Sequence, residues 1–218
     1  LFITASNPLA SSSGSDYISN TIQLSGGNDV FSTMGIDDDI EAYDLFKNPE
    51  ETDAPLIIGN YRCIKDDNGV PNTVLGNYLI QNIAEIRRDS VVFLSCRRES
   101  VVNNSRNEVR SILEDAATLP STSYATLDSG WKYIYDRYND RYIWVPTSGD
   151  HAGCYSRTDR NRDPWYSAAG EQRGLINNVI KLAFNPNEAQ RDQLYSHRVN
   201  PIVSFPGIGT MLYGDKTL

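Results

Sequence analysis

Between residues 55 and 127, short apolar runs alternate with segments of helical periodicity. The runs APLIIGN and VVFLSC predict buried strands, and the segments after them favour helices. The resulting order is strand, helix, strand, helix, strand. This order predicts an α/β fold with a mostly parallel sheet, flanked by helices and connected by right-handed crossovers.

Two helices are expected within this stretch. The first covers residues 72–88 and ends on two arginines, and its apolar face comprises Val74, Leu75, Tyr78, Leu79, Ile83 and Ile86. The second starts at Ser105, which forms a capping box with Glu108. Its apolar face is Val109, Ile112, Leu113, Ala116 and Ala117.

Two shorter elements precede the alternation. Residues 1–23 are expected to form a linker and an entering strand, because apolar and polar residues alternate from Ile18 to Leu24 before two glycines. An acidic segment then predicts a short helix that contains Ile40, Tyr43 and Phe46 and is ended by Pro49.

An aromatic β-hairpin is expected at residues 131–145. Trp131, Tyr133 and Tyr135 alternate with other residues, and Tyr142 and Trp144 do the same after a plausible turn at 139–140. Cross-strand ring pairs on one face would stabilise this hairpin, and we expect the rings to pack in the domain.

The rest of the chain is expected to be richer in loops, beginning just after Pro146. One helix is marked by Asn185 as N-cap, Pro186 in the first turn and Glu188. Two short strands, PIVSF and TMLYG, are expected on either side of a PGIG turn.

The charge balance limits the partners. Asp and Glu outnumber Lys and Arg, and the formal net charge is −8, which argues against nucleic acid or an anionic membrane as the main partner. Three widely spaced cysteines suggest neither a disulfide framework nor a metal site, and a reducing compartment fits them best.

No catalytic, cofactor or metal site is predicted. His151 and Cys154 lack further ligands nearby, and the acidic run at 37–41 lacks the glycine and the final Glu of a calcium loop. The glycines in GIGTMLYG are wrongly spaced for a dinucleotide loop. A Ser-His-Asp hydrolase is the enzyme alternative, but no GxSxG elbow is present.

Several stretches resemble contractile tail sheath proteins. The segments are LSGGNDV, IEAYDLFKNPEETDAPLIIGN, EIRRDSVVFLS, RYIWVPTSGDHAGCYSRTDRNRDPWYSAAGEQRGLI and VNPIVSFPGIGTMLYGDKTL. The positions that match the family pattern, as structural or assembly residues, are Trp144, Pro146, Gly149, Gly153, Thr158, Asp159, Trp165, Gly170, Arg173, Gly174, Asn200, Pro201, Gly207, Gly209 and Lys216. The likeness is greatest to sheaths of large contractile-tailed bacteriophages, and type VI secretion and tailocin sheaths are a near alternative.

The resemblance implies a structural subunit of the virion, present in the host cytoplasm during assembly. It would polymerise with copies of itself in six-fold rings around a tail tube protein, meet tail terminator or baseplate proteins, and contract to drive the tube through the host envelope. It implies no enzyme activity and no cofactor. From the net charge and the lack of an apolar run long enough for a membrane span, we expect neither nucleic acid nor membrane insertion. Residues 24–218 would be the core domain, with a subtilisin-like arrangement, and the C-terminal part of the family's inner domain would be absent, as in a truncated chain.

Overall fold

The structure is a computed structural model, and it describes residues 34–65 and 71–218. The chain divides into two units after Thr33, and the described residues belong to the second unit, Met34–Leu218. The strand expected between residues 18 and 24 lies outside the described residues.

A four-stranded parallel sheet forms the first layer of this unit. Its strands lie in the order β1 (Leu56–Ile58), β2 (Val91–Ser95), β3 (Ala125–Asp128) and β8 (Val199–Asn200). The three predicted strands are therefore present, and the mixed α/β fold with a parallel sheet is confirmed. The fourth strand was not predicted, because two residues are too few to show a period of two.

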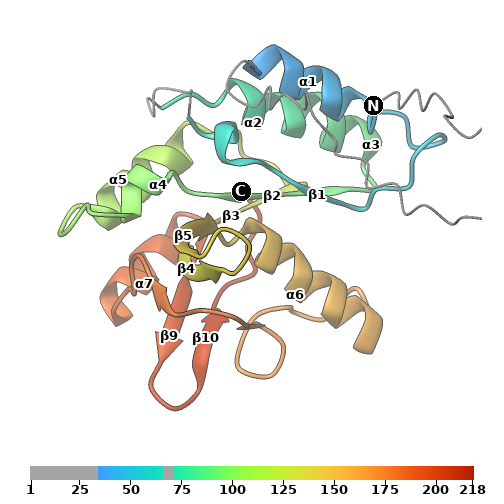
Figure 1. Cartoon of the computed structure of the whole chain (residues 1–218). Coiled ribbons are helices and arrows are strands. Elements are labelled where there is room, and N and C mark those ends of the chain that lie inside the picture. The colour runs from blue at the N-terminus through green and yellow to red at the C-terminus, as the bar shows by residue number, and fades with distance from the viewer. Residues whose placement is uncertain (1–33, 66–70) are drawn as a thin grey trace, which may run out of the picture. The chain divides into compact units, whose positions relative to one another are not determined.

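Helices cover both faces of this sheet. Helices α1 (Ile36–Asp44), α2 (Val74–Tyr78) and α3 (Glu85–Arg87) lie over one face, and α6 (Ser148–Asn161) lies under the other (Figure 1). The first turn of α1 contains three aspartates, which suit the positive end of the helix dipole. The predicted acidic helix is thus confirmed.

The helical segment at residues 74–87 contains a π-helical turn, η3 (Leu79–Ala84), between α2 and α3. A hydrogen bond from i to i+5 adds a residue to each turn, so the buried face rotates along the segment. As a result Ile86, expected on the apolar face, is 58% exposed, and Val74, at the first position of α2, is also 56% exposed. Ile80 and Ala84 are fully buried instead.

The helix expected to start at Ser105 begins later. Helix α5 is Glu108–Ala117, its N-cap position is Asn107, and no side chain caps it, so the predicted capping box is wrong. Arg106 adopts a left-handed backbone conformation with φ of 78°, which prevents the helix from starting earlier. A short helix that was not predicted, α4 (Arg98–Val101), precedes the turn.

Two antiparallel sheets complete the unit. One has the order β5 (Arg141–Pro146), β4 (Trp131–Asp136) and β7 (Lys181–Leu182). The other has the order β6 (Leu175–Ile176), β10 (Gly209–Leu212) and β9 (Ile202–Phe205). The expectation of a mostly parallel sheet therefore holds for the first layer alone, while the predicted strands around the PGIG turn are confirmed.

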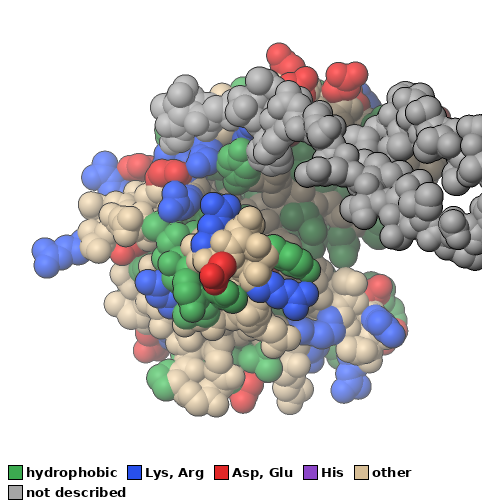
Figure 2. All heavy atoms as spheres, in the orientation of Figure 1, with side chains coloured by type: hydrophobic (Ala, Val, Ile, Leu, Met, Phe, Trp, Pro, Cys, Tyr) green, Lys and Arg blue, Asp and Glu red, His purple; other side chains and the backbone are tan. Residues whose placement is uncertain are grey.

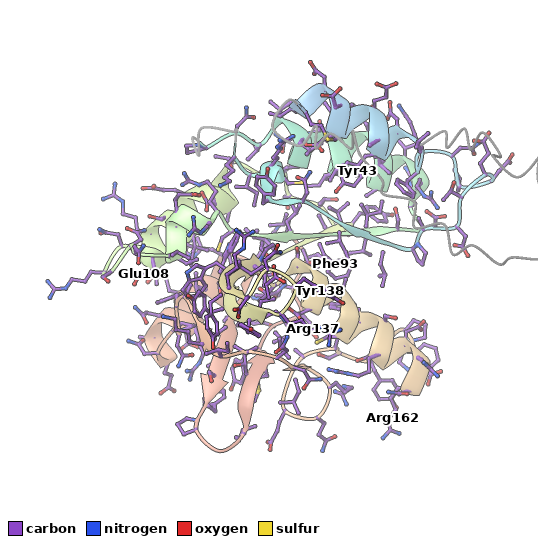
Figure 3. All side chains as sticks on the ribbon, in the orientation of Figure 1. Tyr43, Phe93, Glu108, Arg137, Tyr138 and Arg162 are labelled. Carbon is purple, nitrogen blue, oxygen red and sulfur yellow. The ribbon has the colours of Figure 1, made fainter. Side chains whose placement is uncertain are left out.

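Strands β4 and β5 pair along their whole length, with Tyr133 opposite Trp144 and Tyr135 opposite Tyr142. The ring centroids of Tyr133 and Trp144 are 4.8 Å apart. Burial decreases towards the tip: Trp131 is 5% exposed, whereas Tyr135 and Tyr142 are 44% and 55% exposed. The rings thus pack in the domain at one end of this pair of strands and face solvent at the other, where Figure 3 labels Arg137 and Tyr138.

Helix α6 corrects the expectation of a loop after Pro146. Its buried positions recur at helical spacing but are mostly polar or small: Ser148, His151, Ala152, Cys154 and Thr158. Apolar periodicity is therefore weak, and the sequence does not show the helix.

The N-cap assignment in the last helix was also wrong. Helix α7 (Glu188–Ser196) is capped by Asn187, whose side chain accepts a hydrogen bond from the backbone N–H of Gln190. Asn185 instead accepts from the backbone N–H of Ser204 at 2.8 Å and donates to its carbonyl at 3.1 Å.

Residues far apart in the sequence share the main core. The larger cluster surrounds the parallel sheet and includes Leu79, Leu127, Val199 and Leu218. The backbone of Leu218 donates to the carbonyl of Ala125 at 2.9 Å and accepts from the N–H of Thr122 at 2.8 Å. The parallel layer is thus completed by the last part of the chain. No helix in the described ranges is long and apolar enough to cross a membrane.

Candidate functional site

The parallel strands bring polar side chains together at their carboxyl ends. Asp128, the last residue of β3, is fully buried and accepts hydrogen bonds from the Ser95 hydroxyl at 2.9 Å and the Thr147 hydroxyl at 2.6 Å. The backbone N–H of Gly130 donates to the same carboxylate at 2.9 Å. These bonds replace the water that a buried carboxylate loses.

His151, in the first part of α6, completes this group. Its Nδ1 lies 3.5 Å from Oδ2 of Asp128, and the side chain is fully buried. The ring packs edge-on against Phe93, which projects from β2 towards α6 (Figure 3), with centroids 5.1 Å apart. Within the described part of the chain neither ring nitrogen has a hydrogen-bond partner. We call Ser95, Asp128, Thr147 and His151 the Asp128 cluster.

The Asp128 cluster has the residue types of a hydrolase but not the arrangement. A serine nucleophile needs its hydroxyl on the imidazole, with the carboxylate on the other ring nitrogen. Here both hydroxyls donate to the carboxylate, and the imidazole is sealed from solvent. The cluster therefore holds no nucleophile–base pair and instead joins the parallel sheet to α6.

Sequence reasoning missed this cluster, although a signal was available. Ser95 and Asp128 lie at the carboxyl ends of two predicted strands, and parallel strands place such positions at one edge of a sheet. Thr147 and His151 lay in the segment expected to be loop, so nothing in the sequence connected them to that edge.

The two sets of residues considered as metal ligands lie apart in the structure, in α1 and α6. The described residues contain no group of three or more His, Cys, Asp and Glu side chains that could hold an ion. His151 lies in the first turns of α6 and Cys154 is buried, as the alternative of a helix-start histidine and a buried cysteine expected. Asp39, in the acidic run, forms an ion pair with Arg62 at 3.2 Å.

A second polar contact ties α6 to β4. Nζ of Lys132 lies 2.9 Å from the carboxylate of Asp150 and donates to the carbonyl of Asn177 at 3.3 Å. Burial raises the pKa of Asp150, and the nearby Lys132 ammonium partly offsets that rise.

The motif residues on β5 and α6 comprise a buried or half-buried group and an exposed group. Trp144 is half-buried, with Nζ of Lys181 5.5 Å from its ring, and Pro146 pairs with Trp131 at the end of β5. Thr158 is buried and donates to the carbonyl of Cys154 at 2.8 Å. In contrast, the motif positions on the outer surface of α6 are exposed: Gly149, Gly153 and Asp159.

The motif residues at 170–174 fasten a loop to β10. Gly170 has φ of 91°, and its N–H donates to the carbonyl of Leu212 at 2.9 Å. A Cβ on Gly174 would lie 2.6 Å from that carbonyl oxygen, so only glycine fits there. Nε of Arg173 donates to the carbonyl of Ser167 at 2.5 Å and closes the loop.

The last motif residues fasten the C-terminal segment. The buried Asn200 amide accepts from the backbone N–H of Lys216 and donates to its carbonyl, both at 2.8 Å. The carbonyl of Pro201 accepts from the N–H of Tyr213 at 2.9 Å. Gly207 and Gly209 have φ of 80° and 113° in the turn between β9 and β10.

Comparison with known proteins confirms the family resemblance. Residues 60–218 match the family model described as the phage tail sheath protein central domain. The chain belongs to the phage tail sheath family. It is 37% identical to the tail sheath protein of Enterobacteria phage T4 over 226 residues, and 35% identical to that of Vibrio phage KVP40 over 213.

These matches cover 94% and 91% of this chain but 34% and 31% of the two relatives, so the chain spans about a third of their length. Among solved structures, the sheath complex of an extracellular contractile injection system in its contracted state is 20% identical. The two share a TM-score of 0.46 over 59% of this chain and 32% of the other.

Within this sheath family chain, some motif positions are exposed to solvent. Added Cβ atoms at Gly149 and Gly153 would meet nothing within 4 Å. Trp165, in the loop after α6, is 78% exposed and contacts Tyr166, with ring centroids 6.5 Å apart. Asp159 is also exposed.

Proposed function

We propose that the chain is the central part of a structural sheath subunit that polymerises around a tail tube and contracts to drive it through a host envelope. The match of residues 60–218 to the central domain of phage tail sheath proteins carries this proposal. The curated relatives at 35% and 37% identity bear the name tail sheath protein.

The proposed partners follow from this role. The subunit contacts copies of itself in six-fold rings, the tail tube protein, and tail terminator or baseplate proteins, with neither nucleic acid nor membrane insertion. It is a component of the phage virion and assembles in the host cytoplasm. No cofactor takes part, because contraction draws on energy stored in the packing of subunits rather than on catalysis.

The proposed domain is residues 24–218, with residues 1–23 as linker and entering strand. We assign it a subtilisin-like core that lacks the protease chemistry. The parallel layer with helices on both faces is compatible with such a core. The Asp128 cluster supports the absence of hydrolysis, because its hydroxyls bond the carboxylate and not the imidazole.

The exposed motif residues are proposed as assembly contacts. A tryptophan that is 78% exposed leaves a large apolar ring in water, and such rings are enriched where proteins meet. Gly149 and Gly153 would let a neighbouring backbone approach α6 closely. The remaining motif residues, Asn200 and Gly174 among them, have structural roles.

The test is negative-stain electron microscopy of the chain within its complete coding sequence, with sedimentation velocity of the same samples. We expect regular tubes, and we expect Trp165→Ala to reduce them without changing the stability of the subunit. Tyr138→Ala is the matched control, because Tyr138 is 84% exposed but lies outside the motif. Persistent monomers in the unmodified protein would contradict the proposal.

A further inference from the structure

A pocket at the carboxyl-terminal end of α6 has a one-sided charge. It has a volume of about 220 Å³ and lies between α6 and the loop that precedes β6. Its lining contains three arginines and no carboxylate: Arg157, Thr158, Asn161, Arg162, Gln172 and Arg173. Figure 2 shows Lys and Arg side chains on the surface at this end of α6. We call it the arginine pocket.

Most shielded arginines elsewhere in the described ranges have carboxylate partners, although the half-buried Arg191 contacts a backbone carbonyl and two aromatic rings instead. Three of them lie within 3.2 Å of one: Arg62 beside Asp39, Arg87 beside Asp89, and Arg97 beside Asp115. Arg157 and Arg173 are also half-buried, but neither forms an ion pair with any described residue. The pocket therefore places two half-buried guanidinium groups together without a carboxylate in its lining.

Backbone contacts hold the two half-buried guanidinium groups in place. Nη2 of Arg157 donates to the carbonyl of Leu175 at 2.9 Å and to that of Arg173. Nε of Arg173 donates to the carbonyl of Ser167, and its guanidinium lies 5.8 Å from the Tyr166 ring centroid. The donors Nε and Nη1 of Arg157 and both Nη atoms of Arg173 remain free of hydrogen bonds to described residues.

Arg162 adds a third, adaptable charge. It is exposed at the C-cap of α6, where Figure 3 labels it, and no hydrogen bond or ion pair joins its side chain to the described part of the chain. Three positive groups around a small volume repel one another, and an anion among them removes that repulsion. A guanidinium also presents paired N–H donors that match two oxygens of one group.

We propose that the arginine pocket binds an oxyanion, a carboxylate or a phosphate group. Arg157 and Arg173 supply fixed donors, and Arg162 closes over the bound group. An acidic segment of a second copy is one source: residues 36–53 contain eight Asp or Glu and one Lys. Inorganic phosphate is the other. The site is a property of the single chain, so its presence or absence is independent of sheath assembly.

The test is a titration of the 218-residue chain with inorganic phosphate at constant ionic strength, followed by the nitrogen-15 signals of the arginine side chains. We expect saturable shifts of the Arg157 and Arg173 Nε signals. Arg162→Gln should weaken binding by about ten-fold, the loss expected for a charge-assisted hydrogen bond. Arg160→Gln is the matched control, because Arg160 is exposed on α6 but does not line the pocket.

A second arm separates the two sources. A peptide of residues 36–53 is added to the phosphate-bound chain. Displacement of phosphate, with the same dependence on Arg162, identifies a protein carboxylate as a ligand of the pocket. Phosphate binding without displacement identifies the free ion. Shifts that do not saturate, or equal losses in the Arg162 and Arg160 variants, would overturn the proposal, because they report general charge screening.

Discussion

Nδ1 of His151 lies 3.5 Å from Oδ2 of Asp128, and both side chains are fully buried. One residue belongs to α6 and the other to β3, so this contact joins the helix under the sheet to the sheet itself. The same carboxylate also receives the hydroxyls of Ser95 and Thr147. Three elements of the fold thus depend on one acidic side chain.

Asp128→Ala should lower the free energy of unfolding by about 3 kcal/mol, because it leaves buried donors without an acceptor. Urea denaturation followed by circular dichroism measures the change. Asp159→Ala is the control, since Asp159 is exposed on α6, and it should change stability by less than about 0.5 kcal/mol. Equal midpoints for the two variants would show that the cluster contributes nothing to stability.

Substitution by alanine at two motif glycines should change the stability of the chain in opposite directions. Gly153 lies in α6 with open space around its Cβ position, so Gly153→Ala should raise stability by about 0.5–1 kcal/mol. Gly174→Ala should lower it by about 2 kcal/mol, because the new methyl would lie 2.6 Å from the Leu212 carbonyl oxygen. Thermal denaturation of both variants tests the pair, and a gain at Gly174 would refute the close approach.

Replacing Trp131 or Trp165 by alanine should have different effects on the free energy of unfolding. Trp131 is 5% exposed, and its Nε1 donates to the carbonyl of Cys96 at 2.7 Å. Trp131→Ala should therefore cost about 4 kcal/mol. Trp165→Ala removes a ring that is 78% exposed and should stay within about 0.5 kcal/mol of the unmodified chain. A large loss at Trp165 in denaturant titrations would mean that its ring supports the fold rather than assembly.

Stability should fall in mildly alkaline solution. Burial raises the pKa of the Cys63 and Cys96 thiols, whereas the pKa of a thiol in the unfolded chain is about 8.5. Above that pH the unfolded chain releases protons that the folded chain retains, so the stabilising contribution is complete below it and is lost as pH rises.

Urea midpoints at about pH 7.5 and about pH 9.5 measure this loss, which should be about 1 kcal/mol per thiol. The pKa of Tyr155 is raised to about 12 by burial, so at these pH values it stays protonated. Cys96→Ala should reduce the pH dependence. An unchanged dependence in that variant would assign the effect to other groups.

The parallel layer was predictable because its strands are short apolar runs separated by helical faces. Leu94 and Leu127 are buried, as strands covered on both faces require. The π-helical turn was not predictable from spacing. Ile86 lies on the apolar face if the segment is a regular α-helix, so the sequence gives no sign of the extra residue in the turn. Helix α6 was missed because the positions that it buries, such as His151 and Thr158, are polar, so the apolar residues alone do not show a helical period.

The motif residues were identified by their likeness to a family and not by their chemistry. The structure separates those that hold the chain, such as Asn200, from those that face solvent, such as Trp165. That distinction depends on which segments meet in space. The Asp128 cluster joins residues from β2, β3 and α6 with Thr147, which precedes α6. No local sequence pattern predicts contacts between segments so far apart in the chain.

The pairing of Leu127 with Val199, together with the contact of Leu218 with Ala125, has a consequence for biosynthesis. During synthesis β1, β2 and β3 leave the ribosome well before the residues of β8. Until β8 emerges, one edge of β3 in the nascent parallel layer has no paired strand. Open strand edges invite pairing with other chains, and contacts between distant residues form slowly. The early layer and the late segment must therefore fold as one unit, and a nascent chain stalled before residue 199 would expose that edge to its neighbours on the same messenger RNA.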